Sequence, residues 1–75
     1  MIFVTNDHQM GRNIRCLRQK QNLSQEAFSR LVGMECASLD AIEQGILLEM
    51  DAQMLTNICT YFQVDKKSLV EDRFE

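Results

Sequence analysis

The chain has 75 residues, of which 45% are hydrophobic and 25% charged, and its net charge is −3. This length allows one domain with a thin core, for which a partner subunit often adds stability, and the composition is typical of a globular protein. The three cysteines (Cys16, Cys36 and Cys59) have no Cys-x-x-Cys spacing, which favours reduced thiols in a cytoplasmic protein over disulfides or a metal site.

The chain lacks proline and has only three glycines, so long stretches without helix breakers are expected. Residues 1–5 are β-prone and predict an extended arm, which either covers the domain's own core or pairs with a second subunit. This apolar run is too short for a signal sequence or a membrane span. A first helix is expected over about residues 7–21, where Asn6 and Gln9 are a candidate capping pair. Its apolar positions recur at helical spacing and are Met10, Ile14 and Leu17.

Two short helices with a glycine turn between them are expected next. Ser24 is a suitable N-cap for the first, and Gly33 ends it at a position that suits a left-handed backbone. The second should cover residues 35–44, and Gly45 stops it. The residues expected to face inward are Ala27, Phe28, Leu31, Leu39 and Ile42.

An unusually apolar connection over residues 46–50 precedes a helix expected over 51–62, and Asp65 is expected to cap a fifth, short helix. Residues 71–75 should be a charged, frayed tail. The inward stripe of the fourth helix is Met54, Leu55, Ile58, Cys59 and Phe62. The sequence therefore predicts an all-α, compact five-helix domain over residues 6–70, with a helix-turn-helix unit at 24–45.

This pattern resembles the phage-repressor family, also called the Cro/C1-type helix-turn-helix family. The segments that carry the resemblance are residues 11–18, 24–34, 38–45, 55–59 and 62–65. The resemblance implies a repressor-like, sequence-specific DNA-binding transcriptional regulator. It would bind double-stranded DNA as a homodimer, with the third helix in the major groove. The sequence contains no catalytic constellation and no glycine-rich phosphate loop, so we expect no enzyme activity and no cofactor.

The resemblance also implies roles for individual residues. Gln25 matches a glutamine that meets a DNA phosphate at a helix N-terminus. Arg18 and Glu43 match a pair that joins the first helix to the end of the third. The positions implied to contact DNA along the third helix are Glu35, Cys36, Ala37, Ser38, Ala41 and Gln44.

The third helix departs from the family pattern in the residues that would read bases. Cys36, Ala37 and Ala41 cannot form the bidentate hydrogen bonds that distinguish adenine and guanine, although they could touch thymine methyl groups. Arg12 and Arg15 could instead supply contacts to the phosphates that flank the groove.

Charge is distributed unevenly along the chain. Residues 12–30 have a net charge of +4, whereas residues 35–51 carry five acidic side chains and no lysine or arginine. Ile46, Leu47 and Leu48 are expected to form an exposed apolar run, and together with the acidic segment they favour an alternative function. In this alternative the domain is a protein-interaction or antitoxin-like module with weak or no DNA binding.

Two smaller alternatives concern single residues. His8 is the only histidine and lies in or near the expected N-terminal cap of the first helix, so we expect a surface residue rather than a catalytic base. Cys36, at the start of the third helix, could act as a redox-sensitive thiol, since a helix N-terminus lowers a thiol pKa, but Glu35 opposes this effect.

Overall fold

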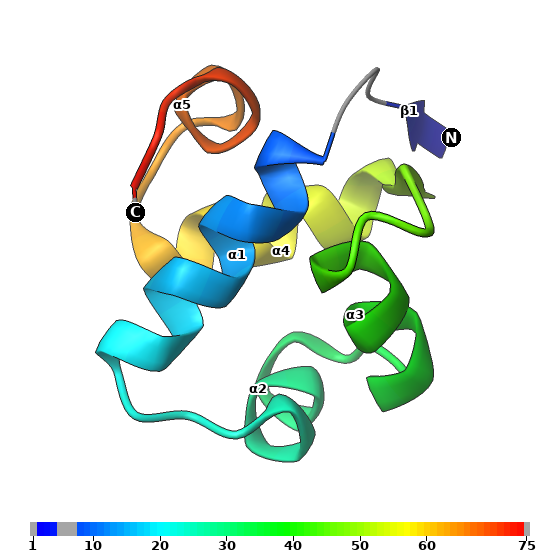
Figure 1. Cartoon of the computed structure of the whole chain (residues 1–75), viewed down its shortest axis with the longest axis vertical. Coiled ribbons are helices and arrows are strands. Elements are labelled where there is room, and N and C mark those ends of the chain that lie inside the picture. The colour runs from blue at the N-terminus through cyan, green and yellow to red at the C-terminus, as the bar shows by residue number, and fades with distance from the viewer. Residues whose placement is uncertain (1, 5–7, 75) are drawn as a thin grey trace.

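Five helices and one two-stranded antiparallel sheet make up the described part of the chain, residues 2–4 and 8–74, in a computed structural model (Figure 1). In chain order they are β1 (Ile2–Val4), α1 (Gln9–Lys20), α2 (Gln25–Val32), α3 (Cys36–Glu43), β2 (Glu49–Asp51), α4 (Ala52–Phe62) and α5 (Lys66–Glu71). The prediction of five helices is confirmed, and the two short strands add to it.

The helix ends follow local signals in the sequence. The Ser24 hydroxyl accepts a hydrogen bond from the Ala27 N–H at 3.0 Å, and the Asp65 carboxylate accepts one from the Ser68 N–H at 2.7 Å. Both predicted N-caps are therefore confirmed. Gly33 ends α2 with a φ of +78°, as its position predicts. The predicted cap at Asn6 lies outside the described residues, and the N-cap residue of α1 is His8, whose exposed side chain makes no capping hydrogen bond.

The core is formed by side chains from all five helices and from β2. Its buried hydrophobic residues are Met10, Ile14, Phe28, Val32, Leu39, Ile42, Met50, Leu55, Ile58, Cys59 and Leu69. The expectation that Leu31 faces inward is wrong, since 56% of this residue is exposed. Phe28, Ser29 and Val32 define the buried face of α2, and Leu31 lies roughly 100° around the helix from the middle of that face.

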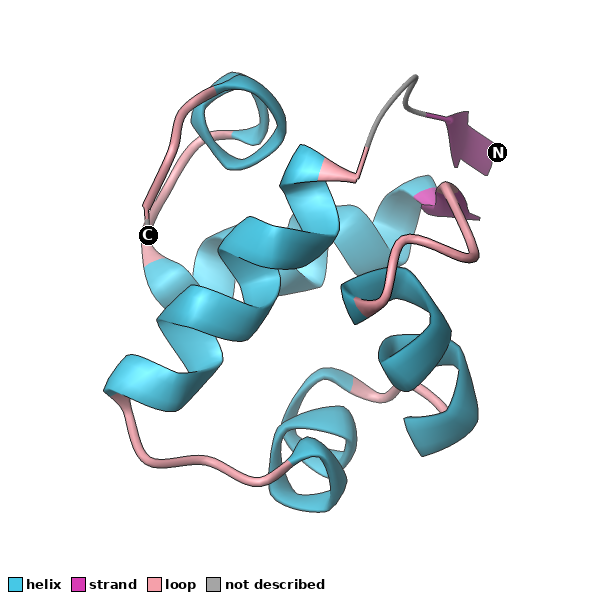
Figure 2. Cartoon of the chain, in the orientation of Figure 1, coloured by secondary structure: helices cyan, strands magenta, loops and turns pink. Residues whose placement is uncertain are grey.

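The N-terminal arm packs on its own domain. Ile2 pairs with Asp51, Phe3 with Met50 and Val4 with Glu49. Side chains alternate across a strand, so Phe3 packs against the core while Ile2 and Val4 stay 64% and 62% exposed. Figure 2 shows the two strands together at one end of the helical body.

The connection before β2 is only partly exposed. Ile46 is 75% exposed, but Leu47 packs against the core and Leu48 is half-buried. The expected exposed run of three apolar residues is therefore wrong at Leu47 and Leu48, which are both partly buried. The backbone explains this arrangement, because the N–H groups of both Ile46 and Leu47 donate to the Ala41 carbonyl and fold the loop back onto α3.

The C-terminal segment is held against α1 as far as it is described. The fully buried Asn13 side chain donates to the carbonyls of Leu69 (2.7 Å) and Asp72 (2.6 Å) and accepts from the Phe74 N–H (3.2 Å). The expectation of a frayed tail is thus wrong for residues 71–74. A buried amide needs hydrogen-bond partners, and this segment supplies two of them, at Asp72 and Phe74, while α5 supplies the third at Leu69.

No helix in the described ranges reaches the length and apolar character that crossing a bilayer requires.

Candidate nucleic-acid interface

The helix-turn-helix unit is built by α2, α3 and the turn between them. The N–H groups of Gly33 and Met34 both donate to the Ser29 carbonyl, at 2.9 and 2.8 Å, so the chain turns sharply after α2. Ser29 is buried, and its hydroxyl donates to the Glu26 carbonyl. A small side chain at this position lets α2 and α3 pack closely.

One side of α3 is buried and the other faces solvent. Leu39, Ile42 and Glu43 point into the domain. The positions implied to contact DNA lie at the surface: Glu35, Ala37 and Gln44 are exposed, and Cys36, Ser38 and Ala41 are half-buried. Glu35 is the N-cap residue of α3 and makes no side-chain capping hydrogen bond. This face combines small side chains with polar groups at the two ends of the helix.

Arg18 and Glu43 form the expected ion pair, which links α1 to the last residue of α3. Arg18 Nε lies 2.8 Å from Glu43 Oε2, and Arg18 Nη2 lies 2.9 Å from Glu43 Oε1. The two side chains are only 10% and 3% exposed, and Arg18 Nη1 also donates to the Leu23 carbonyl at 2.6 Å. The hydrogen bond with Glu43 raises the pKa of Arg18 above its ordinary value. This two-bond geometry fixes the position of α3 against α1.

The side chain of Gln25, the first residue of α2, lies across the end of α3. Its Nε2 donates to Asp40 Oδ1 at 3.0 Å and to Glu43 Oε1 at 3.2 Å. Gln44 Nε2 donates to Asp40 Oδ2 at 2.6 Å. The hydrogen bonds from Gln25 and then from Gln44 lower the pKa of the half-buried Asp40, so its carboxylate stays charged.

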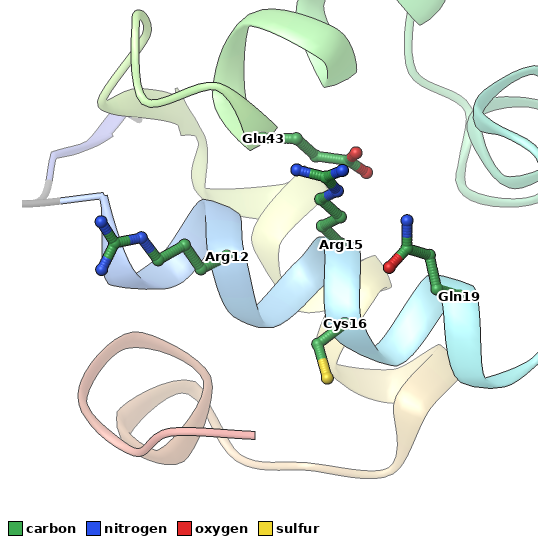
Figure 3. Close-up of a pocket in the computed structure, with 5 residues that line it drawn as sticks. All are labelled: Arg12, Arg15, Cys16, Gln19 and Glu43. Atoms are coloured by element: carbon green, nitrogen blue, oxygen red, sulfur yellow. The ribbon is translucent and has the colours of Figure 1, made fainter. Parts of the chain in front are cut away.

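Arg12 and Arg15 lie exposed on α1, beside the end of α3. They line a shallow pocket of about 320 Å³ together with Cys16, Gln19 and Glu43 (Figure 3). In Figure 3 the side chains of Arg15, Gln19 and Glu43 lie close to one another, and Arg12 points along the helix toward its N-terminus.

A second pocket, of about 260 Å³, adjoins the first, and Arg15, Gln19 and Glu43 line both of them. Among its lining residues are also Gln25, Asp40 and Gln44. The fold thus brings Arg15, Gln25 and Gln44 to one polar groove, whereas Cys36 and Ala37 lie outside both pockets. Gln19 and Asp40 also line the groove, but they were not among the site residues predicted from the sequence. Their spacing was a usable signal, because Gln19 follows Arg15 by four residues, Asp40 precedes Gln44 by four, and residues four apart share one face of a helix.

No group of three or more His, Cys, Asp and Glu side chains in residues 2–4 and 8–74 is arranged to hold a metal ion.

Comparisons with known proteins identify the fold. No protein-family model matches the chain, and no curated protein sequence matches it. The structure is similar to the N-terminal DNA-binding domain of SinR from Bacillus subtilis, with a TM-score of 0.80 and 20% identity over 91% of this chain and 99% of that one. It is also similar to SinR in complex with DNA (TM-score 0.75, 19% identity, 83% of this chain and 98% of that one).

A third similar structure is the P22 c2 repressor in complex with a synthetic operator, with a TM-score of 0.70 and 22% identity over 83% of this chain and 92% of that one. The chain therefore has the fold of the Cro/C1-type helix-turn-helix DNA-binding domains.

Proposed function

We propose that this protein is a DNA-binding transcriptional regulator that lays α3 in the major groove and acts as a homodimer. The observation that carries the proposal is the α2–α3 unit, because the outer face of α3 is open to solvent. The fold that presents this unit is shared with SinR and the P22 c2 repressor. Both of those proteins have been solved with DNA. A helix presented in this way can enter the major groove of B-DNA.

Phosphate contacts come from α1 and from the start of α2. Arg12 and Arg15 are exposed beside the end of α3, where the phosphates flanking the groove would pass. The backbone N–H of Gln25 has no acceptor within the described ranges, so it is free to meet a phosphate at a helix N-terminus. For its side chain to do the same, Gln25 must release Asp40 and Glu43.

Base contacts from α3 are weaker than the phosphate contacts in this proposal. Cys36, Ala37 and Ala41 offer apolar surface to thymine methyl groups, and Ser38 offers one hydroxyl. Asp40 keeps its charge and disfavours a close approach of phosphates. Sequence preference should therefore be modest, with much of the affinity supplied by counterion release.

Replacing both Arg12 and Arg15 with alanine should weaken DNA binding about equally on different sequences. Each lost phosphate contact should cost about tenfold in affinity at 50 mM salt and reduce the salt slope by about one. Fluorescence anisotropy with two unrelated 20-base-pair duplexes across a salt series measures both quantities.

The exposed Arg73, in the C-terminal segment, provides the matched control as Arg73→Ala, which should bind like the parent protein. If the parent protein binds neither duplex at low salt, the proposed function is wrong. A sequence-selective loss in the double variant would contradict the phosphate role of Arg12 and Arg15.

Dimerisation should depend on the exposed apolar side chains near the sheet. Ile2, Val4 and Ile46 are three of the five large hydrophobic residues that are exposed in the described part of the chain. Ile46→Lys should shift the mass in light scattering from twice 8.7 kDa toward 8.7 kDa. The reason is that burying the lysine charge in an apolar interface costs free energy that no contact there restores. Leu31→Lys, on α2, is the matched control. A parent protein that is monomeric at all concentrations contradicts the homodimer.

A further inference from the structure

A second groove lies on the side of α3 away from the arginines of α1. It has a volume of about 240 Å³ and is bounded by the start of α3, by β2 and by the start of α4. In Figure 1 the chain passes from the end of α3 through the loop toward α4. Apolar side chains line its interior, namely Met34, Ile42, Leu47, Met50 and Met54. Leu47 thus forms a wall of the groove.

Acidic side chains form the rim of this groove. Glu35, Glu49 and Asp51 line it and are exposed. The carboxylates of Glu35 and Glu49 have no partner in the described part of the chain, and Asp51 accepts only a backbone hydrogen bond from Gln53. Residues 35–51 contain no lysine or arginine that could neutralise the rim.

The size of the groove limits what can bind in it. Pockets for drug-sized ligands and cofactors are usually about 300–1,000 Å³, so this groove suits one large apolar side chain better than a cofactor. Three methionines line it, and flexible thioether side chains can repack around different apolar groups. The acidic rim repels the phosphates of a nucleic acid and attracts a cationic partner.

We propose that this groove binds a cationic peptide segment of a partner protein, with one leucine-sized side chain inserted among Met34, Met50 and Met54 and basic side chains on the rim. The groove opens on a different side of α3 from the arginine pockets of α1, and the proposal does not depend on DNA binding.

The experiment uses the full chain and a fluorescein-labelled peptide, Gly-Lys-Arg-Leu-Arg-Lys-Gly, with anisotropy as the readout at 50 mM salt. Two matched peptides separate the contribution of the leucine side chain from that of the basic side chains. One has alanine in place of leucine, and the other has glutamate at every basic position. Saturable binding of the first peptide is expected. Loss of the leucine side chain should weaken binding about tenfold, and reversal of charge should abolish it.

Variants of the protein test whether the peptide binds in this groove. The double variant Glu35→Gln, Glu49→Gln should weaken peptide binding about two- to fivefold for each charge removed, whereas Glu71→Gln, on α5, should leave it unchanged. The amide resonances of Ser38, Glu49 and Met50 should shift in ¹H–¹⁵N spectra on addition of the peptide, and those of α5 should not.

The proposal is overturned if the leucine peptide does not bind saturably, if the alanine peptide binds as well as the leucine peptide, or if the shifted resonances cluster elsewhere. Failure of this peptide experiment leaves the DNA titration unaffected, so the two proposals fail separately.

Discussion

Replacing Glu43 with alanine is expected to unfold much of the protein. Its carboxylate makes both hydrogen bonds to the buried Arg18 guanidinium, and the variant leaves that cation in the interior without a counter-charge. Breaking a buried pair by removing one partner costs about 3–5 kcal/mol, which is comparable to the whole stability of a domain of this size, roughly 3–5 kcal/mol. Urea unfolding followed by circular dichroism measures the loss.

Two further variants give this prediction its controls. Glu71→Ala removes an exposed carboxylate at the end of α5 and should change the free energy of unfolding little. The double variant Arg18→Met, Glu43→Leu should recover much of the stability lost in Glu43→Ala, because an apolar pair leaves no buried charge. A loss below about 1 kcal/mol in Glu43→Ala would mean that solvent reaches Arg18 freely.

Gly11→Ala should also destabilise the fold, although alanine in a helix is usually about 1 kcal/mol better than glycine. Gly11 lies in the first turn of α1, where this helix meets the end of α3. A Cβ atom on Gly11 would overlap the Ile42 carbonyl oxygen and crowd Glu43 Cα, at 3.3 Å. Because backbone atoms cannot turn aside as a side chain can, the two helices must separate. We expect a loss of about 1–3 kcal/mol or more, measured by urea unfolding.

Gly33→Ala is the comparison for this prediction. A Cβ at Gly33 would meet no atom within 4 Å, so the variant should lose only the strain of a left-handed backbone, about 1–2 kcal/mol. If Gly11→Ala were instead more stable than the parent, α1 and α3 would not approach each other as closely as described.

Much of the fold was predictable because its signals are local. Ser24 and Asp65 cap the helices that follow them, and Gly33 adopts the left-handed conformation that its place between two short helices requires. Apolar spacing correctly identified Met10, Ile14 and Ile42 as buried. Each of these predictions depends on residues within one or two helical turns.

The candidate site was predictable in part. The resemblance implied the Arg18–Glu43 pair, and the structure contains it. The hydrogen bonds from the Gln25 side chain to Asp40 and Glu43 were not predicted from the sequence. These bonds join the start of α2 to the end of α3, so no local pattern in the sequence indicates them. The acidic charge of residues 35–51 was visible in the sequence, but the groove that it surrounds was not.

The sequence by itself determined the five helices, their caps, the glycine turn and the uneven charge along the chain, because capping and helical periodicity act between close neighbours. Only the tertiary structure decided the pairing of β1 with β2, the exposure of Leu31, the packing of Leu47 against the core and the docking of residues 72–74 on Asn13. These features depend on contacts between segments far apart in the chain. A three-residue strand or a single loop leucine has too short a pattern to show which surface will cover it.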